Sequence, residues 1–250
     1  MVEARVNGSK PLLFAFDTGT TTCLIDAQVA RRLGIQPVSR PGREGPGFAR
    51  ARTLAVGRAT ARDLELVIRD LSPFSKQLGL ELAGIIGFTW MEQFVFEIDY
   101  RENRLALWPR TAELIPRADQ LPLPLELHSA PGFTGASLYV PVTLDGRRCL
   151  AEIDTGAETG VLGRRMGARL GATLKPIDRP QGLPTHTVSR VELAGRVFAN
   201  VPFKLDPRLG SDMRPYGQCV IGNELLKAFV VTFDIPRRRV FFQSVLPQPD

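Results

Sequence analysis

The sequence predicts an all-β protein made of two related halves. Most of its 250 residues fall into short strand-like runs that are separated by glycine and proline turns, with few short helical stretches. The segment Leu13 to Gly19 also returns as Leu150 to Gly156, and its Asp-Thr-Gly recurs 137 residues further along the chain. A repeat of this kind indicates duplication of one structural unit.

Each Asp-Thr-Gly follows a predicted β-hairpin. Asn7-Gly8 precedes the first copy and Asp145-Gly146 precedes the second, between strand-like runs. Both dipeptides favour tight turns that need positive φ. Each Asp-Thr-Gly is therefore expected at the end of the second strand of its hairpin.

A short helix is predicted after each Asp-Thr-Gly. The first spans residues 26–33 and is closed by Gly34, and the second spans 164–170 and is closed by Gly171. Glycine is favoured at this position because it adopts the left-handed backbone conformation that ends many helices.

Two aliphatic residues and a glycine then recur 135 residues apart, as Ile85-Ile86-Gly87 and Val220-Ile221-Gly222. A brief helical stretch follows each copy, and then Phe96 to Asp99 in the first half or Thr232 to Ile235 in the second. Four landmarks in the same order favour duplication over coincidence.

A proline-rich segment separates the halves. Five prolines lie in residues 109–135, which indicates a linker. The predicted organisation is an N-terminal lobe over 1–108 with the first Asp-Thr-Gly, a linker over 109–135, and a C-terminal lobe over 136–250 with the second.

Composition excludes several classes of function. The net charge is +6, with 27 arginines and 5 lysines, but the sequence has neither a clustered basic patch nor stacking aromatic residues, so we expect no nucleic-acid partner. Three cysteines, odd in number and far apart, and two histidines do not form a disulfide framework or a zinc site, and no cofactor is expected. A Cys149–Cys219 bridge is compatible with the sequence, although buried free thiols are commoner.

No segment is predicted to cross a membrane. The longest uncharged apolar stretch near the middle of the chain, 82–91, is much shorter than the roughly 20 residues that a spanning helix needs. A strand-like run follows Met1 at once, without a signal peptide. We therefore expect a soluble protein that is either cytoplasmic or exported with its signal segment removed.

With these two Asp-Thr-Gly turns and the two aliphatic-aliphatic-Gly strands, the chain resembles the aspartic peptidases. The resemblance extends over nearly all of both halves, and it is closer to a fused pair of retropepsin-type protomers than to a full pepsin. It implies two pseudo-symmetric acid-protease lobes, each a small closed β-barrel with short helices.

The resemblance also assigns roles to residues. Asp17 and Asp154 would be the catalytic pair, and Thr18 and Thr155 would bond across the lobe interface. Gly19 and Gly156 would let the backbone approach the carboxylates closely at the turns. Gly87 and Gly222 would belong to the strands beneath the turns.

Two adjacent carboxyl groups that share one proton can supply both the base and the acid that amide hydrolysis requires. We therefore interpret the chain as an aspartic endopeptidase, acting on a peptide or protein substrate through a water activated between Asp17 and Asp154. Because both carboxylates come from one chain, a monomer suffices. The alternative is a non-catalytic peptide-binding module with the same fold, which retention of both turns and both strands argues against.

The two halves differ in ways that bear on the site. Thr20 follows the first Asp-Thr-Gly, whereas Ala157 follows the second, so only one side has a hydroxyl group. Flap hairpins over the cleft are predicted at 41–47 and 180–186, with Gly45, Phe48 and His186 as flap candidates. His186 is expected in a loop. Two glutamates near the second turn are expected on solvated faces, and these are Glu152 and Glu158.

Overall fold

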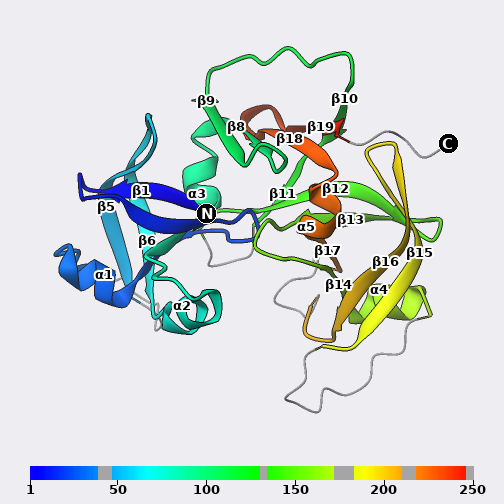
Figure 1. Cartoon of the computed structure of the whole chain (residues 1–250), viewed down its shortest axis with the longest axis horizontal. Coiled ribbons are helices and arrows are strands. Elements are labelled where there is room, and N and C mark those ends of the chain that lie inside the picture. Colours follow the sequence, from blue (N-terminus) through cyan, green and yellow to red (C-terminus); the bar gives the residue numbers. More distant parts are fainter. Residues whose placement is uncertain (39–46, 130–133, 172–182, 210–217, 246–250) are drawn as a thin grey trace.

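The residues that the structure describes form three β-sheets, two with seven strands and one with five, and each half contributes one seven-stranded sheet (Figure 1). The computed structural model describes residues 1–38, 47–129, 134–171, 183–209 and 218–245. The Gly45 candidate and most of the two predicted flap segments lie outside these residues.

In the first half, six strands close into a barrel in the order β1-β2-β7-β3-β6-β5, because β1 pairs with β5 as well as with β2. A short strand, β4, extends this sheet beyond β5. The strands are β1 (Val2–Val6), β2 (Leu12–Phe16), β3 (Cys23–Asp26), β4 (Pro37–Val38), β5 (Phe48–Val56), β6 (Ala59–Arg69) and β7 (Gly84–Ile86).

The second half repeats this arrangement in the order β12-β13-β17-β14-β16-β15, closed by pairing of β12 with β15 and extended by β11. Its strands are β11 (Glu126–His128), β12 (Ser137–Leu144), β13 (Arg147–Ile153), β14 (Gly160–Gly163), β15 (Thr185–Leu193), β16 (Arg196–Asp206) and β17 (Cys219–Ile221). The predicted fold, two pseudo-symmetric lobes with small closed barrels, is confirmed.

A five-stranded sheet joins the two halves, in the order β10-β19-β18-β8-β9, and its labels follow this order across the upper part of Figure 1. Central strands from different halves, β8 and β18, pair antiparallel with Phe96 opposite Phe233. Its strands are β8 (Phe94–Asp99), β9 (Arg104–Pro109), β10 (Gln120–Pro124), β18 (Phe229–Asp234) and β19 (Arg239–Ser244).

The proline-rich segment 109–135 contains strands, since β10 belongs to the shared sheet and β11 to the second barrel. Its prolines suit this position. Pro122 and Pro124 lie on an edge strand, where a missing N–H costs no hydrogen bond of the sheet. The division at 1–108, 109–135 and 136–250 remains our proposal.

The helices are short, and the two that were predicted from glycine stops are confirmed. Helix α1 (Ala27–Arg32) is followed by Gly34 at φ +66°, and α4 (Arg164–Arg169) is followed by Gly171 at φ +73°. The other helical elements are α2 (Ser72–Leu78), α3 (Phe88–Met91), α5 (Asn223–Leu226) and the 3-10 turn η1 (Ile235–Arg237).

The predicted hairpin turns are also confirmed, because all four residues of the two dipeptides have positive φ: Asn7 and Gly8 at 51° and 79°, Asp145 and Gly146 at 44° and 75°. In the second half Leu144 pairs with Arg147, so that only two residues form the turn.

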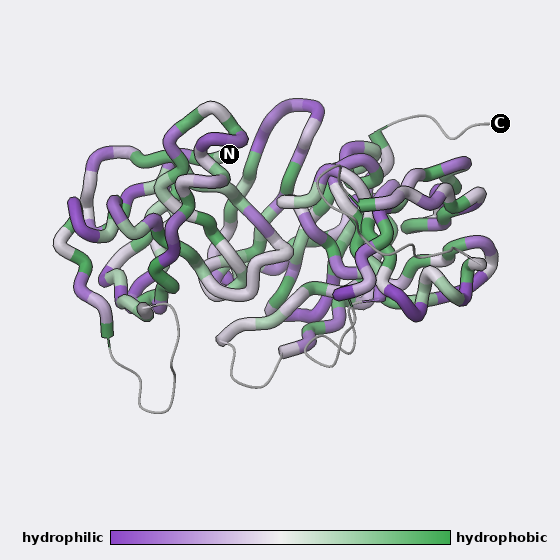
Figure 2. The backbone as a smooth tube through the Cα atoms, turned by 90° about the horizontal axis from the view of Figure 1, so that it is seen from below, coloured by the Kyte–Doolittle hydropathy of each residue, from purple (hydrophilic) through white to green (hydrophobic). Residues whose placement is uncertain are grey.

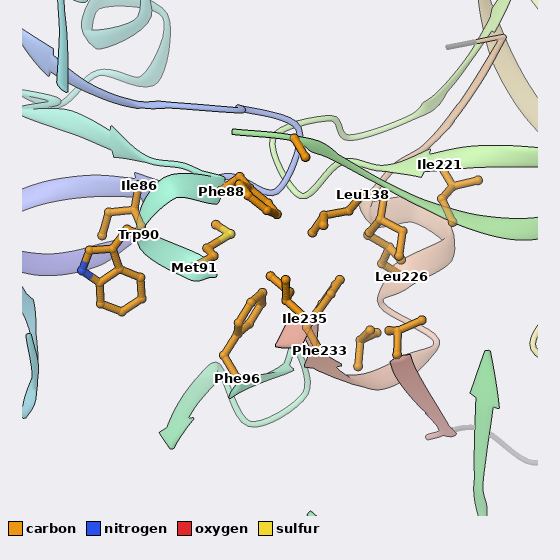
Figure 3. Close-up of a cluster of buried hydrophobic side chains, with 14 of the residues drawn as sticks. Ile86, Phe88, Trp90, Met91, Phe96, Leu138, Ile221, Leu226, Phe233 and Ile235 are labelled. Atoms are coloured by element: carbon orange, nitrogen blue, oxygen red, sulfur yellow. The ribbon is translucent and has the colours of Figure 1, made fainter. Parts of the chain in front are cut away.

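One hydrophobic core runs through both halves (Figure 3). Phe96 and Phe233 stack with ring centroids 4.6 Å apart, at the junction of the halves. Along the outer strands hydrophobic and hydrophilic residues are interspersed (Figure 2), as expected for sheets with one buried face. The continuous core and the shared sheet fix the two Asp-Thr-Gly turns relative to each other.

Candidate active site

Each Asp-Thr-Gly begins where a barrel strand ends. β2 ends at Phe16 and pairs in parallel with β7, and the Asp17 N–H donates to the Ile86 carbonyl at 3.0 Å. β13 pairs in parallel with β17 in the same way, and the Asp154 N–H donates to the Ile221 carbonyl at 3.0 Å. The aliphatic strand next to each turn thus holds the backbone of the aspartate.

Gly87 and Gly222 follow these aliphatic strands and lie against the turns. A Cβ on Gly87 would come within 2.5 Å of the Thr20 carbonyl oxygen, and one on Gly222 within 2.6 Å of the Ala157 carbonyl oxygen. Any larger residue would push the turn out of place, which explains why glycine occupies both positions.

Two threonines lock the turns together across the two halves. The Thr18 hydroxyl donates to the Ile153 carbonyl at 2.7 Å, and the Thr155 hydroxyl donates to the Phe16 carbonyl at 2.9 Å. Each hydroxyl also accepts a hydrogen bond from the backbone N–H of the other threonine, at 3.1 Å in both cases. These four hydrogen bonds hold the two turns in a two-fold arrangement.

Gly19 and Gly156 each face the carboxyl group of the opposite turn. A Cβ on Gly156 would come within 2.8 Å of Asp17 Cγ, and a Cβ on Gly19 would collide with Asp154 Cγ. The glycines therefore allow the Asp17 and Asp154 carboxyl groups to lie side by side, within hydrogen-bond contact of each other.

The two carboxyl groups receive different hydrogen bonds. At Asp17 the Gly19 N–H donates to Oδ1 at 2.8 Å, and the Thr20 hydroxyl donates to Oδ2 at 2.7 Å. At Asp154 the N–H groups of Gly156 and Ala157 both donate to Oδ1, at 2.8 and 3.1 Å. The single hydroxyl at Thr20 therefore makes the pair asymmetric.

The environment of Asp154 favours its protonated form. Burial, the charge of Asp17 and the hydrogen bond shared with Asp17 raise the pKa of Asp154 to about 7, against the opposing effect of the Gly156 N–H. The charge of Glu152 raises it further. The pair is thus arranged to retain one proton up to about neutral pH.

The two glutamates near the second turn differ in exposure. Glu158 is exposed, as expected, and it pairs with Lys227 at 2.9 Å. The expectation of a solvated face is wrong for Glu152, which is only 2% exposed. Its strand lies between β12 and β17, and positions 152 and 154 share a face of the strand, so Glu152 lies on the same side as Asp154.

The flap candidates within the described part of the chain lie on strands. Phe48 is the first residue of β5 and pairs with Val67 and with Val38 of β4. The expectation of a loop is wrong for His186, which is the second residue of β15 and lies opposite Phe203. Pairing with β16 extends that strand further toward the predicted flap than the local sequence indicated.

Sequence reasoning missed a hydrogen-bond chain behind the second turn. The Tyr100 hydroxyl donates to Asn223 Oδ1 at 2.7 Å, and Asn223 Nδ2 donates to the Thr155 carbonyl at 3.0 Å. Burial and the charges of Asp154 and Glu158 raise the pKa of Tyr100. One sequence feature could have indicated this chain: the residue after the second aliphatic-aliphatic-Gly is the polar Asn223, whereas the equivalent residue of the first half is Phe88.

Within the described ranges, no group of three or more histidine, cysteine or acidic side chains is placed to hold a metal ion. The three cysteines, Cys23, Cys149 and Cys219, are free thiols. The helices in the same part of the chain include none that is long and apolar enough to cross a membrane.

The two barrels and the paired Asp-Thr-Gly turns define the acid-protease fold. Residues 2–90 match the family model of aspartyl proteases, a stretch that contains the first turn and Ile85-Ile86-Gly87. The first 90 residues are therefore similar to aspartyl proteases, and the resemblance to aspartic peptidases is confirmed.

No curated protein matches the sequence. Among solved structures, a retropepsin-like aspartic protease from Rickettsia conorii matches at 15% identity and a TM-score of 0.37, covering 53% of this chain and 96% of that chain.

Proposed function

We propose that this chain is an aspartic endopeptidase that hydrolyses peptide bonds with a water activated between Asp17 and Asp154. The observation that carries the proposal is the contact between the two carboxyl groups, one of which has its pKa raised to about 7. A purely structural turn has no need of two half-buried carboxyl groups in contact, since like charges so close oppose each other.

The hydrogen bonds assign the two roles. Asp17, with a backbone N–H on one oxygen and the Thr20 hydroxyl on the other, is held as the carboxylate that takes a proton from the attacking water. Asp154, protonated below about pH 7, donates to the carbonyl oxygen of the scissile peptide.

Water attack gives a tetrahedral diol, with its new C–O bond formed and one proton transferred to Asp17. When the C–N bond breaks, a proton must reach the leaving amine, and the pair returns to its singly protonated state once the products have left. This cycle consumes one water and needs no cofactor.

The substrate is a peptide or protein segment that reaches the pair between the two lobes. The predicted flaps at 41–47 and 180–186 would close over it. Because both carboxylates belong to one chain, we propose that the monomer is the active unit.

The test is digestion of a peptide library from pH 3 to 8 with the wild type, Asp17→Asn and Asp154→Asn. Either substitution should reduce kcat/KM by at least about a thousandfold, because one carboxyl cannot fill both roles. Wild-type cleavage should fall as pH rises through about 7, where Asp154 loses its proton.

Asp63→Asn is the matched control, because Asp63 is an exposed aspartate at positive φ that asparagine tolerates. It should cleave as the wild type does. A wild-type protein that binds peptides without cleaving them would establish the binding module instead, and turnover retained by either dyad variant would exclude the mechanism.

A further inference from the structure

A groove of about 730 Å³ lies beside β9, at one edge of the five-stranded sheet. It is lined by Leu105, Leu107 and Trp108 of β9, by the turn Gly57–Arg58 between β5 and β6, and by the first residues of the chain. Neither dyad carboxyl lines it. In the part of the chain that the structure describes, β9 pairs only with β8.

The opposite edge of the same sheet is covered. β10 pairs antiparallel with β19 over five residues, with Leu121 opposite Phe242 and Leu123 opposite Val240. Leu121 also lies against the turn between β15 and β16, because a Cβ on Gly195 would come within 2.8 Å of Leu121 Cδ1. β10 thus lies between β19 and that turn.

The duplication makes the two edges equivalent. An offset of 135 residues relates β9 to β19, so Leu105 corresponds to Val240 and Leu107 to Phe242. The turn Gly57–Arg58 likewise corresponds to the turn that contains Gly195, because each joins the two long strands of its barrel. The groove therefore occupies the place that β10 fills in the second half.

Burial shows the effect of the covering strand. Val240 is 0% exposed and Phe242 is 1% exposed, beneath β10. Their counterparts Leu105 and Leu107 pack against the core but are only half-buried. Two leucines at alternate positions of β9 thus leave apolar surface in the groove.

The prolines of β10 indicate which backbone N–H and C=O groups of β9 are free to pair with an added strand. Pro122 and Pro124 have no N–H, so in β10 the residues that exchange hydrogen bonds with β19 are Leu121 and Leu123. Their partners in β19 turn their N–H and C=O groups toward β10. By the same offset, Leu105 and Leu107 turn these groups toward the groove.

We propose that β9 and this groove form a docking site for an extended segment of a partner polypeptide, which pairs antiparallel with β9 and carries leucines at alternate positions, as β10 does. The sheet that already joins the two halves would then have six strands, with the partner segment as the added edge strand. Backbone hydrogen bonds to Leu105 and Leu107 would hold it, and its leucines would fill the groove.

The probe is a fluorescein-labelled peptide with the sequence of residues 120–126, Gln-Leu-Pro-Leu-Pro-Leu-Glu. Its anisotropy is measured against full-length protein in the Asp17→Asn background, so that cleavage cannot consume it. The peptide should bind, and a control peptide with aspartate in place of each leucine should not.

Two variants of β9 separate backbone pairing from side-chain contact. Leu105→Ala removes the side chain and keeps the N–H, whereas Leu105→Pro also removes the N–H that faces the groove. The proline variant should bind the peptide roughly tenfold more weakly than the alanine variant. In protein with an unmutated β9, hydrogen exchange of the Leu105 and Leu107 amides should slow when the peptide is added, which tests pairing independently of how the proline variant folds.

No binding at protein concentrations up to about 1 mM, equal binding by the two variants, or unchanged exchange at both amides would overturn the proposal. Self-association that Leu105→Pro abolishes would place a second copy of this chain in the groove, and would overturn the proposed occupant. Because these readouts do not depend on catalysis, they stand apart from the test of the dyad.

Discussion

A single hydroxyl group, present at Thr20 and absent at Ala157, distinguishes the surroundings of the two carboxyl groups of the site. The Thr20 hydroxyl donates to Oδ2 of Asp17, whereas Ala157 offers Asp154 only its backbone N–H. Burial of Asp154, the nearby charge of Glu152 and this missing hydroxyl together favour the shared proton on Asp154. The sequence alone showed the difference, but the oxygen that the hydroxyl contacts required the structure.

The raised pKa of Asp154 has a consequence for stability. An aspartate with its pKa raised from 3.8 to about 7 stabilises the folded state only while it is protonated. That contribution is complete below about pH 4 and is lost as pH rises toward 7. Each pK unit is worth about 1.4 kcal/mol, so the loss amounts to about 4 kcal/mol.

Asp154→Asn cannot ionise and should be spared this loss. Urea unfolding at pH 4, 5.5 and 7.5 should show the variant gaining stability relative to the wild type as pH rises, by up to about 4 kcal/mol at pH 7.5. Asp63→Asn, measured alongside, should show no such trend. A difference between wild type and Asp154→Asn that is constant over this range would contradict the assigned protonation.

At the scale of single elements, the buried side chain of Asp26 connects helix α1 to two other segments of the first barrel. Asp26 caps the helix with hydrogen bonds to the N–H groups of Gln28 and Val29, at 2.8 and 3.2 Å. Its other oxygen accepts from the Leu71 N–H at 3.0 Å. The same side chain thus ties the end of β3, the start of α1 and the chain after β6 together.

Asp26→Ala should destabilise the protein by about 2–4 kcal/mol, because it removes a cap and leaves buried N–H groups without an acceptor. The free energy of unfolding in urea measures this. Asp26→Asn keeps one oxygen acceptor and should cost clearly less. A loss below about 0.5 kcal/mol in the alanine variant would show that water or a shifted backbone replaces the carboxylate.

The elements that the sequence predicted best are those with local signals. Asn7-Gly8, Asp145-Gly146, Gly34 and Gly171 have positive φ because their local sequence demands it. β10 and the position of His186 were not predicted, because both depend on pairing with strands distant in the chain, β19 and β16. The local sequence of a proline-rich stretch predicts a linker. Such a stretch becomes a strand only when it pairs with a strand that is distant in the chain, as β10 does with β19.

For the molecule as a whole, the two halves are joined at three levels. The threonine hydrogen bonds fix the turns, β8 pairs with β18, and Thr232 of the second half donates to the buried Glu97 of the first at 3.0 Å. Arg104 and Arg117 also contact that glutamate, at 2.9 and 3.4 Å. The repeat predicted two lobes, but a shared sheet between them leaves no local pattern in either half.

This joining predicts that the dyad forms within one chain. Asp17→Asn and Asp154→Asn, each inactive, should remain inactive when they are mixed in equal amounts and incubated, because each molecule carries one intact and one damaged turn in a single fixed site. Wild-type kcat should also be unchanged on dilution from micromolar to nanomolar concentration. Turnover that returns on mixing would mean that two chains exchange lobes and build the site between them, since only such an exchange can bring an intact Asp17 next to an intact Asp154.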